Sequence, residues 1–165
     1  MNLKIFSNKS HKILLFFLFI FAIYCALTIG KSWDEKFQLH QGKVVLDYLF
    51  SFGRIDESYY LREHYAPIYW SLKYLLTQIL PFKFQTEVSH LINISASLTV
   101  IFGIGKLSKE LFNRNVGKIV FLILFFYPVF FGHMGFNDKD MVLAICHVWI
   151  FYLIIRYFRK QDVND

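Results

Sequence analysis

The chain contains 165 residues, of which 56% are hydrophobic and 20% aromatic, and this apolar share exceeds that of an ordinary soluble domain. The 20 Phe residues, set against 3 Pro and 8 Gly, exclude a disordered or collagen-like chain. The formal net charge is +6, but the Lys and Arg residues are spread between apolar runs, so we expect membrane lipids and not nucleic acid as partners.

Four apolar runs predict a single all-α membrane domain over residues 1–165. They lie at about residues 13–29, 88–105, 116–132 and 141–157, and we expect about four transmembrane helices. The first run carries no charge and would extend about 26 Å as a helix, close to the hydrocarbon thickness of a bilayer. Basic residues precede this run as in a signal peptide, but no Ala-x-Ala site follows it, so we expect an uncleaved anchor.

The positions of Lys and Arg predict the direction of the spans. Basic residues lie before the first span, between the second and third spans, and after the fourth span: Lys4, Lys9, Lys12, Lys106, Lys109, Arg114, Lys118, Arg156, Arg159 and Lys160. Short loops rich in Lys and Arg stay in the cytoplasm. We therefore expect a multi-pass protein of a membrane such as the bacterial inner membrane, with both termini cytoplasmic and with outer loops at 31–87 and 133–140.

The first outer loop is predicted to hold amphipathic helices that lie at the membrane interface. Ser32 and Glu35 have the spacing of a capping box, and apolar residues at helical spacing follow until Gly53. Pro67 is well placed to begin a second interfacial helix, over Pro67 to Leu80. At about 14 residues this stretch is short for a span, although a fifth span is the alternative.

Acidic residues lie at both outer mouths of the predicted bundle. Asp34 and Glu35 closely follow the first span, where either chemistry or simple stabilisation by a helix dipole would account for them. The second outer loop places His133, Asp138, Lys139 and Asp140 within eight residues. Such density at a membrane boundary is costly unless the groups are paired, hydrated or used. Asp138 and Asp140 form an Asp-x-Asp pattern that could hold a divalent metal, although the sequence requires no cofactor.

One face of the second span is polar. His90, Asn93 and Ser97 are spaced so that they share this face of a helix. They could form hydrogen bonds between helices or line a cavity that opens outward, and the sequence leaves both interpretations open.

The order of these features resembles the N-terminal part of the GT-C membrane glycosyltransferases, especially the protein O-mannosyltransferase and lipid A aminoarabinose transferase group. The features are the Asp34-Glu35 pair after the first span, a long amphipathic loop ending in His64-Tyr65-Ala66-Pro67, and Asp140 in the second outer loop. Members of this group place a catalytic acid in the first outer loop and use a polyprenyl-phosphate sugar as donor.

The resemblance implies a cell-envelope glycosyltransferase that moves a sugar to a hydroxyl of a lipid, glycan or protein on the periplasmic or lumenal side. Asp34 matches the catalytic acid, with Glu35 adjacent, and Asp140 matches the second-loop acid. His64 falls in a stretch that is richer in Pro in the family, and Lys139 stands where Arg is more usual. Substrate-binding roles are expected for the remaining candidates: Arg62, His64, His133, Asp138 and Lys139.

The length of the chain departs from the family, whose members have roughly ten or more spans. We therefore expect this chain to be the N-terminal part of a larger enzyme, because later helices would supply residues of the donor site. The alternative is a small four-span structural or transport component without catalytic activity.

Overall fold

The structure is a computed structural model that describes residues 8–54, 67–79 and 84–161. The described residues contain seven helices and no strand, which confirms the predicted all-α class. The helices are α1 (Asn8–Thr28), α2 (Glu35–Phe50), α3 (Pro67–Gln78), α4 (Gln85–Leu111), α5 (Arg114–Phe126), α6 (Pro128–His133) and α7 (Asp138–Gln161).

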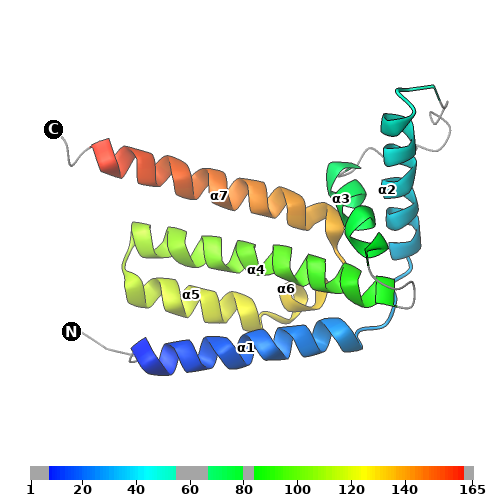
Figure 1. Ribbon diagram of the computed structural model, residues 1–165. Coiled ribbons are helices and arrows are strands. Elements are labelled where there is room, and N and C mark those ends of the chain that lie inside the picture. The colour runs from blue at the N-terminus through cyan, green and yellow to red at the C-terminus, as the bar shows by residue number, and fades with distance from the viewer. Residues whose placement is uncertain (1–7, 55–66, 80–83, 162–165) are drawn as a thin grey trace.

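The helices form a bundle with a cap across one end. In Figure 1, α1, α4, α5 and α7 run alongside one another, whereas α2 and α3 lie across the end of the bundle where α7 begins. The start of α1, the end of α7 and the turn between α4 and α5 lie at the opposite end (Figure 1). The capped end therefore gathers the two segments that were predicted as outer loops, and the open end gathers the basic clusters.

Within the described ranges, three helices are long and apolar enough to cross a membrane, namely α1, α4 and α7. The predicted span over 116–132 is not one helix, because α5 ends at Phe126 and α6 begins at Pro128. Proline lacks the N–H group that would continue the helix, and it disfavours helical geometry in the residue before it. Tyr127 is accordingly extended, with φ −70° and ψ 111°. Neither piece, at 13 and 6 residues, is long enough to span alone.

The helix predicted after Ser32 begins later than expected. Asp34 is the N-cap residue of α2 and makes no side-chain capping bond, so the predicted capping box does not form. The side chain of Glu35 is buried and pairs with His90 instead. The helix ends close to the predicted stop, because Phe52 and Gly53 follow it with positive φ of 55° and 73°.

The amphipathic face of α2 is reversed relative to that of a soluble protein. Its buried side consists mainly of Glu35, Gln38, Gln41, Gly42 and Val44. Its exposed residues include Phe37, Tyr48, Leu49 and Phe50. An apolar surface on the outside and a polar layer inside are favourable only where lipid or further protein covers the helix.

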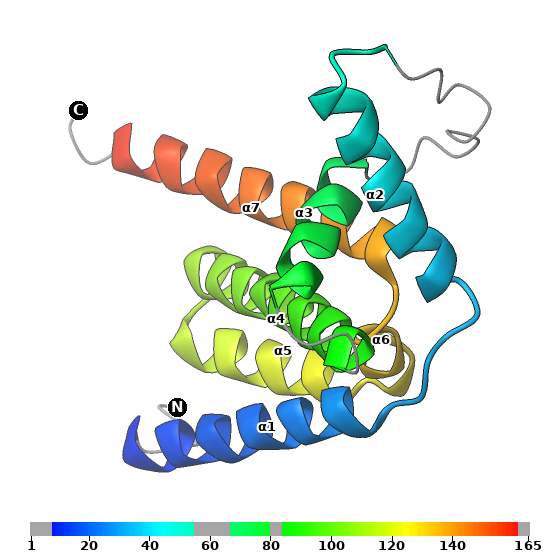
Figure 2. The same ribbon diagram turned by 45° about the vertical axis from the view of Figure 1, so that its right-hand side comes forward.

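The second interfacial helix begins at Pro67, as predicted, and α3 has 12 residues, too few to span a bilayer. It lies against α2 across the end of the bundle (Figure 2). The two helices approach very closely at Gly42, where an added Cβ would lie 2.3 Å from the carbonyl oxygen of Trp70. The Trp70 side chain is buried.

The apolar core lies between α1, α4 and α5. Its buried members include Ala22 and Ala26 on α1, Ile101 on α4 and Phe125 on α5. Small residues allow the helices to approach, because interfaces in membranes depend on close packing more than on the hydrophobic effect. The core includes Ile94, Leu98 and Ile101 of α4 and so holds the middle of this helix in place. The polar residues in the first turns of α4 therefore face the cap.

Candidate functional site

Three polar residues on one face of α4 are buried and hydrogen-bonded. His90, Asn93 and Ser97 are all at most 1% exposed, and each forms a hydrogen bond to another segment of the chain. The Ser97 hydroxyl donates to the carbonyl oxygen of Met134 over 3.2 Å. Of the two interpretations that the sequence left open, interhelical hydrogen bonding is therefore confirmed.

A histidine and a carboxylate join α4 to the start of α2. The two ring nitrogens of His90 face the carbonyl oxygen of Ala26, at 3.1 Å, and Oε1 of Glu35. Both contacts are hydrogen bonds when the ring carries two protons or when the carboxyl group carries one. The pair is buried, and among the described residues Oε2 of Glu35 has no hydrogen-bond partner. The contact fixes the first turn of α2 and thus the position of the neighbouring Asp34.

A second buried network joins α3, α4 and α7. Lys73 forms an ion pair with Asp138 in which both side chains are at most 1% exposed. The other carboxylate oxygen of Asp138 accepts a hydrogen bond from Asn93, whose amide also donates to the carbonyl oxygen of Gly135 over 3.0 Å. The Tyr69 hydroxyl donates to the amide oxygen of Asn93 over 2.6 Å. The network therefore locks the first turn of α7 to the cap.

Burial controls the ionisation of the two α3 groups in this network. Burial raises the pKa of Tyr69, and the Asp138 carboxylate adds to that effect, so the phenol keeps the proton that it donates. Burial also lowers the pKa of Lys73, while the carboxylates of Asp138 and Glu35 oppose that change. An ammonium group at this depth depends on its carboxylate partner.

A cavity of about 200 Å³ opens above these networks at the capped end. It lies between the α1–α2 connection and the α6–α7 connection, and its lining is Ser32, Asp34, Gln38, His133, Phe136, Asn137 and Lys139. Asp34 is exposed, whereas Gln38 is buried, and no described residue bonds to its Oε1. The ammonium group of Lys139 lies 5.9 Å from the centre of the Trp70 ring. A carboxylate, an imidazole, an amide and an ammonium group thus face one volume.

The structure separates the predicted site residues into three sets. Asp34, His133 and Lys139 line the cavity, and Glu35 and Asp138 are buried in the networks described above. Asp140 is exposed and accepts a hydrogen bond from Asn137 over 2.9 Å. Arg62 and His64 lie outside the described residues.

The Asp-x-Asp pattern does not converge on one point. Asp138 binds Lys73 and Asn93 inside the protein, whereas Asp140 binds Asn137 at the surface. Over the described ranges, no group of three or more His, Cys, Asp or Glu side chains could hold a metal ion. A single carboxylate with an ammonium partner is a poor ligand set for a divalent cation, which prefers several oxygen atoms.

Sequence reasoning missed Lys73, the residue that balances Asp138. The signal was present, because Lys73 is the one charged residue between Pro67 and Leu80. A charged side chain within an apolar run needs a partner. Periodicity cannot identify that partner, since Lys73 and Asp138 are 65 positions apart.

Comparison with known proteins adds no family to this picture. No protein-family model, curated protein or solved structure matches the chain. Because one fold can host many functions, the function has to be inferred from the cavity and the side chains around it.

Proposed function

We propose that the chain belongs to an integral membrane glycosyltransferase of the GT-C type. It would transfer a sugar from a polyprenyl-phosphate donor to an acceptor hydroxyl on the outer side of the membrane. The observation that supports this proposal is the cavity in which Asp34 and Lys139, 105 positions apart by numbering, face the same volume. A base and a cation on opposite walls are what the transfer of a group from a phosphate needs.

The proposed topology places the capped end outside. Helices α1, α4 and α7 would cross the membrane, and α5 with α6 would complete a fourth crossing that is broken at Pro128. The basic clusters at the open end would then lie in the cytoplasm with both termini. Large apolar side chains on the outer surfaces of the bundle, such as Phe16, Phe17 and Leu153, are 57–62% exposed and suit contact with lipid.

The proposed reaction follows from the charges around the cavity. Asp34 accepts the proton of the acceptor hydroxyl as its oxygen attacks the anomeric carbon of the sugar. The bond between that carbon and the phosphate oxygen breaks, and its electron pair leaves with the polyprenyl phosphate. Lys139 stabilises the charge that develops on the departing phosphate. Oε1 of Gln38, which no described residue bonds, is suited to accept a hydrogen bond from the sugar or the acceptor.

The buried groups would act as positioning residues. Glu35 follows Asp34 directly, and its contact with His90 fixes the start of α2. Asp138 precedes Lys139 directly, and its contacts with Lys73 and Asn93 fix the start of α7. Each residue proposed for chemistry is therefore adjacent to a buried residue that anchors its backbone.

A small structural or transport component is the second candidate. It is favoured by the four ionisable groups buried near one end of the bundle, namely Glu35, Lys73, His90 and Asp138. Buried ionisable residues often mark the path of an ion or a proton through a membrane protein.

The test compares Asp34→Asn with a matched control in the full-length gene product. Membranes are incubated with a radiolabelled polyprenyl-phosphate sugar, and transfer to endogenous acceptors is measured. Loss of a general base should lower turnover by about a hundred- to ten-thousand-fold without changing membrane insertion. The control is Asp47→Asn, which removes a partly exposed acid of α2 that forms a surface ion pair with Lys43. It should keep normal transfer.

Two outcomes would contradict the proposal. Normal transfer by Asp34→Asn would exclude Asp34 as the base. Absence of transfer by the wild-type protein, together with proton or cation flux across proteoliposomes that contain it, would favour the transport component.

A further inference from the structure

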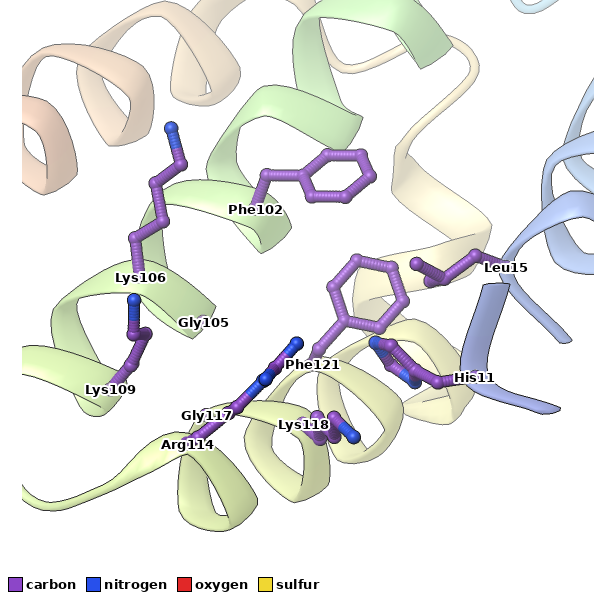
Figure 3. Close-up of a pocket in the computed structure, with 10 residues that line it drawn as sticks. All are labelled: His11, Leu15, Phe102, Gly105, Lys106, Lys109, Arg114, Gly117, Lys118 and Phe121. Atoms are coloured by element: carbon purple, nitrogen blue, oxygen red, sulfur yellow. The ribbon is translucent and has the colours of Figure 1, made fainter. Parts of the chain in front are cut away.

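A second cavity, of about 180 Å³, lies at the open end of the bundle where α1, α4 and α5 meet (Figure 3). Its apolar lining consists of Leu15, Phe102 and Phe121 with Gly105 and Gly117. Its other lining residues are all basic: His11, Lys106, Lys109, Arg114 and Lys118. None of the described lining residues is acidic. The cavity therefore combines positively charged side chains with an apolar wall.

The two glycines bring α4 and α5 into backbone contact beside this cavity. A Cβ added to Gly117 would lie 2.6 Å from the carbonyl oxygen of Gly105 and 3.1 Å from Cβ of Lys109. The close approach keeps basic side chains of both helices around one space. Figure 3 shows Arg114 and His11 extending toward each other on either side of Phe121.

Two cations of the cavity have no carboxylate partner within the described part of the chain. Among the residues that the structure describes, no carboxylate forms an ion pair with Lys109 or Arg114. Nδ1 of His11 is buried, and none of the described residues forms a hydrogen bond with it. Lys106 lies over the rings of Trp149 and Tyr152, at 5.1 and 5.9 Å from their centres. Like charges held this close repel one another unless an anion lies between them.

We propose that this pocket binds a phosphate group and that the phosphate is the headgroup of an anionic phospholipid. Guanidinium and ammonium groups form strong, charge-assisted hydrogen bonds to phosphate oxygens. The apolar wall of Leu15, Phe102 and Phe121 offers a surface for the acyl chain, which a free phosphate ion would leave unused. The apolar wall therefore points to a lipid as the source.

The position of the pocket along the bundle suits a headgroup. His11 and Leu15 lie in the first two turns of α1, at the boundary of a candidate span. Basic pockets between transmembrane helices on the cytoplasmic side are typical sites for anionic lipid headgroups. A bound phosphate would also offset the repulsion between α1 and the α4–α5 pair, so it should stabilise the bundle against heat.

The test uses the purified full-length gene product in a neutral detergent. Three probes are added separately: phosphatidylglycerol, phosphatidylcholine and inorganic phosphate. Bound lipid is counted by native mass spectrometry, and the thermal unfolding midpoint is recorded. We expect phosphatidylglycerol to bind and to raise the midpoint, and we expect phosphatidylcholine and inorganic phosphate to have little effect.

The variant Lys109→Gln with Arg114→Gln removes two cations of the pocket at exposed positions. It should bind phosphatidylglycerol about 30-fold more weakly, since each basic residue near a membrane surface contributes about fivefold. The matched control is Arg156→Gln with Lys160→Gln. It removes two exposed cations near the C-terminal end of α7, which lies at the open end of the bundle. It should change binding by less than about threefold. If the double variant aggregates, Arg114→Gln alone should show the fivefold loss.

The outcomes separate the sources of binding. An equal loss in both double variants would mean general attraction to a basic surface and would overturn the pocket. Stabilisation by inorganic phosphate equal to that by lipid would overturn the phospholipid as the source. Equal binding of the two lipids would mean that the charge of the headgroup is not recognised.

Discussion

The two ends of the bundle both carry charged side chains, but they accommodate these charges in opposite ways. At the capped end, Lys73 and Asp138 are buried and neutralise each other, and Glu35 is buried against His90. At the open end, Lys109 and Arg114 are exposed beside a cavity, and no described carboxylate pairs with them. These charged side chains are buried where the fold places an oppositely charged group beside them, and they remain exposed where it does not.

This difference separates two uses of charge in a membrane protein. A buried pair fixes the geometry of the segments that carry it, because removing either partner leaves an uncompensated charge. An uncompensated cluster at the membrane surface is stabilised by a ligand of opposite charge. The capped end is therefore held together by contacts between its own residues. The open end is suited to stabilisation by a bound anion.

The largest expected effect comes from breaking the buried pair. Lys73→Met leaves Asp138 as an unpaired buried charge and should lower the free energy of unfolding by about 3–5 kcal/mol. The double variant Lys73→Met with Asp138→Leu should recover most of this loss. Lys109→Met at the open end should change stability by less than about 0.5 kcal/mol. Titration with sodium dodecyl sulfate in mixed micelles measures all three, and equal losses for the two lysine variants would refute the contrast between the ends.

The next effect concerns the joint between the cap helices. Gly42→Ala would place a Cβ 2.3 Å from the carbonyl oxygen of Trp70, so α2 and α3 would have to separate. We expect a loss of about 1–3 kcal/mol in the same titration. The matched control is Gly132→Ala in α6, where nothing lies within 4 Å of the added carbon. It should gain about 0.5–1 kcal/mol from helix propensity, and a similar loss at both glycines would disprove the steric explanation.

A smaller effect should be the same at both ends. Asn113 caps α5 by accepting hydrogen bonds from the backbone N–H groups of Asn115 and Val116. Asn137, just before α7, accepts from the N–H of Asp140 over 3.3 Å. Replacing either asparagine by Ala should cost about 1 kcal/mol, because N–H groups of the first turn lose their capping partner: two at Asn113 and one at Asn137. A much larger loss at Asn137, measured by thermal unfolding, would show that the cap depends on this loop in a further way.

The smallest effect is that of salt. Without lipid, raising the salt concentration from about 0.05 to 0.5 M should screen the repulsion between the cations at the open end and stabilise the protein by less than about 1 kcal/mol. Lys109→Gln with Arg114→Gln should lose this dependence, whereas Lys73→Met with Asp138→Leu should keep it. Thermal unfolding at several salt concentrations provides the measurement.

Length and hydropathy were sufficient to predict the long helices, since α1 overlaps the first predicted span to within one residue and α4 and α7 each contain a predicted span. The same measures failed at Pro128, because an apolar run has the same composition whether or not a proline divides it. The proline itself carried the signal, through the missing N–H group that stops α5.

Local patterns could not predict the partners of the buried polar residues. Ser32 and Glu35 matched a capping box, but the Glu35 carboxylate contacts His90, which is 55 positions away. The cavity of Asp34, His133 and Lys139 was predicted only as two separate loops. Proximity between these loops depends on how the cap packs onto α4 and α7, which spacing along the chain does not encode.

The ion pair between Lys73 and Asp138 also has a consequence in time. The partners are 65 positions apart, so at a synthesis rate of about 5–20 residues per second Lys73 emerges roughly 3–13 s before Asp138. Glu35 and His90 are only 55 positions apart, and both are made before Asp138. During the interval Lys73 has to stay in water, because its ammonium group cannot be buried alone. The contact between Glu35 and His90 can therefore form first, and the ion pair between Lys73 and Asp138 can form only after the start of α7 has been made.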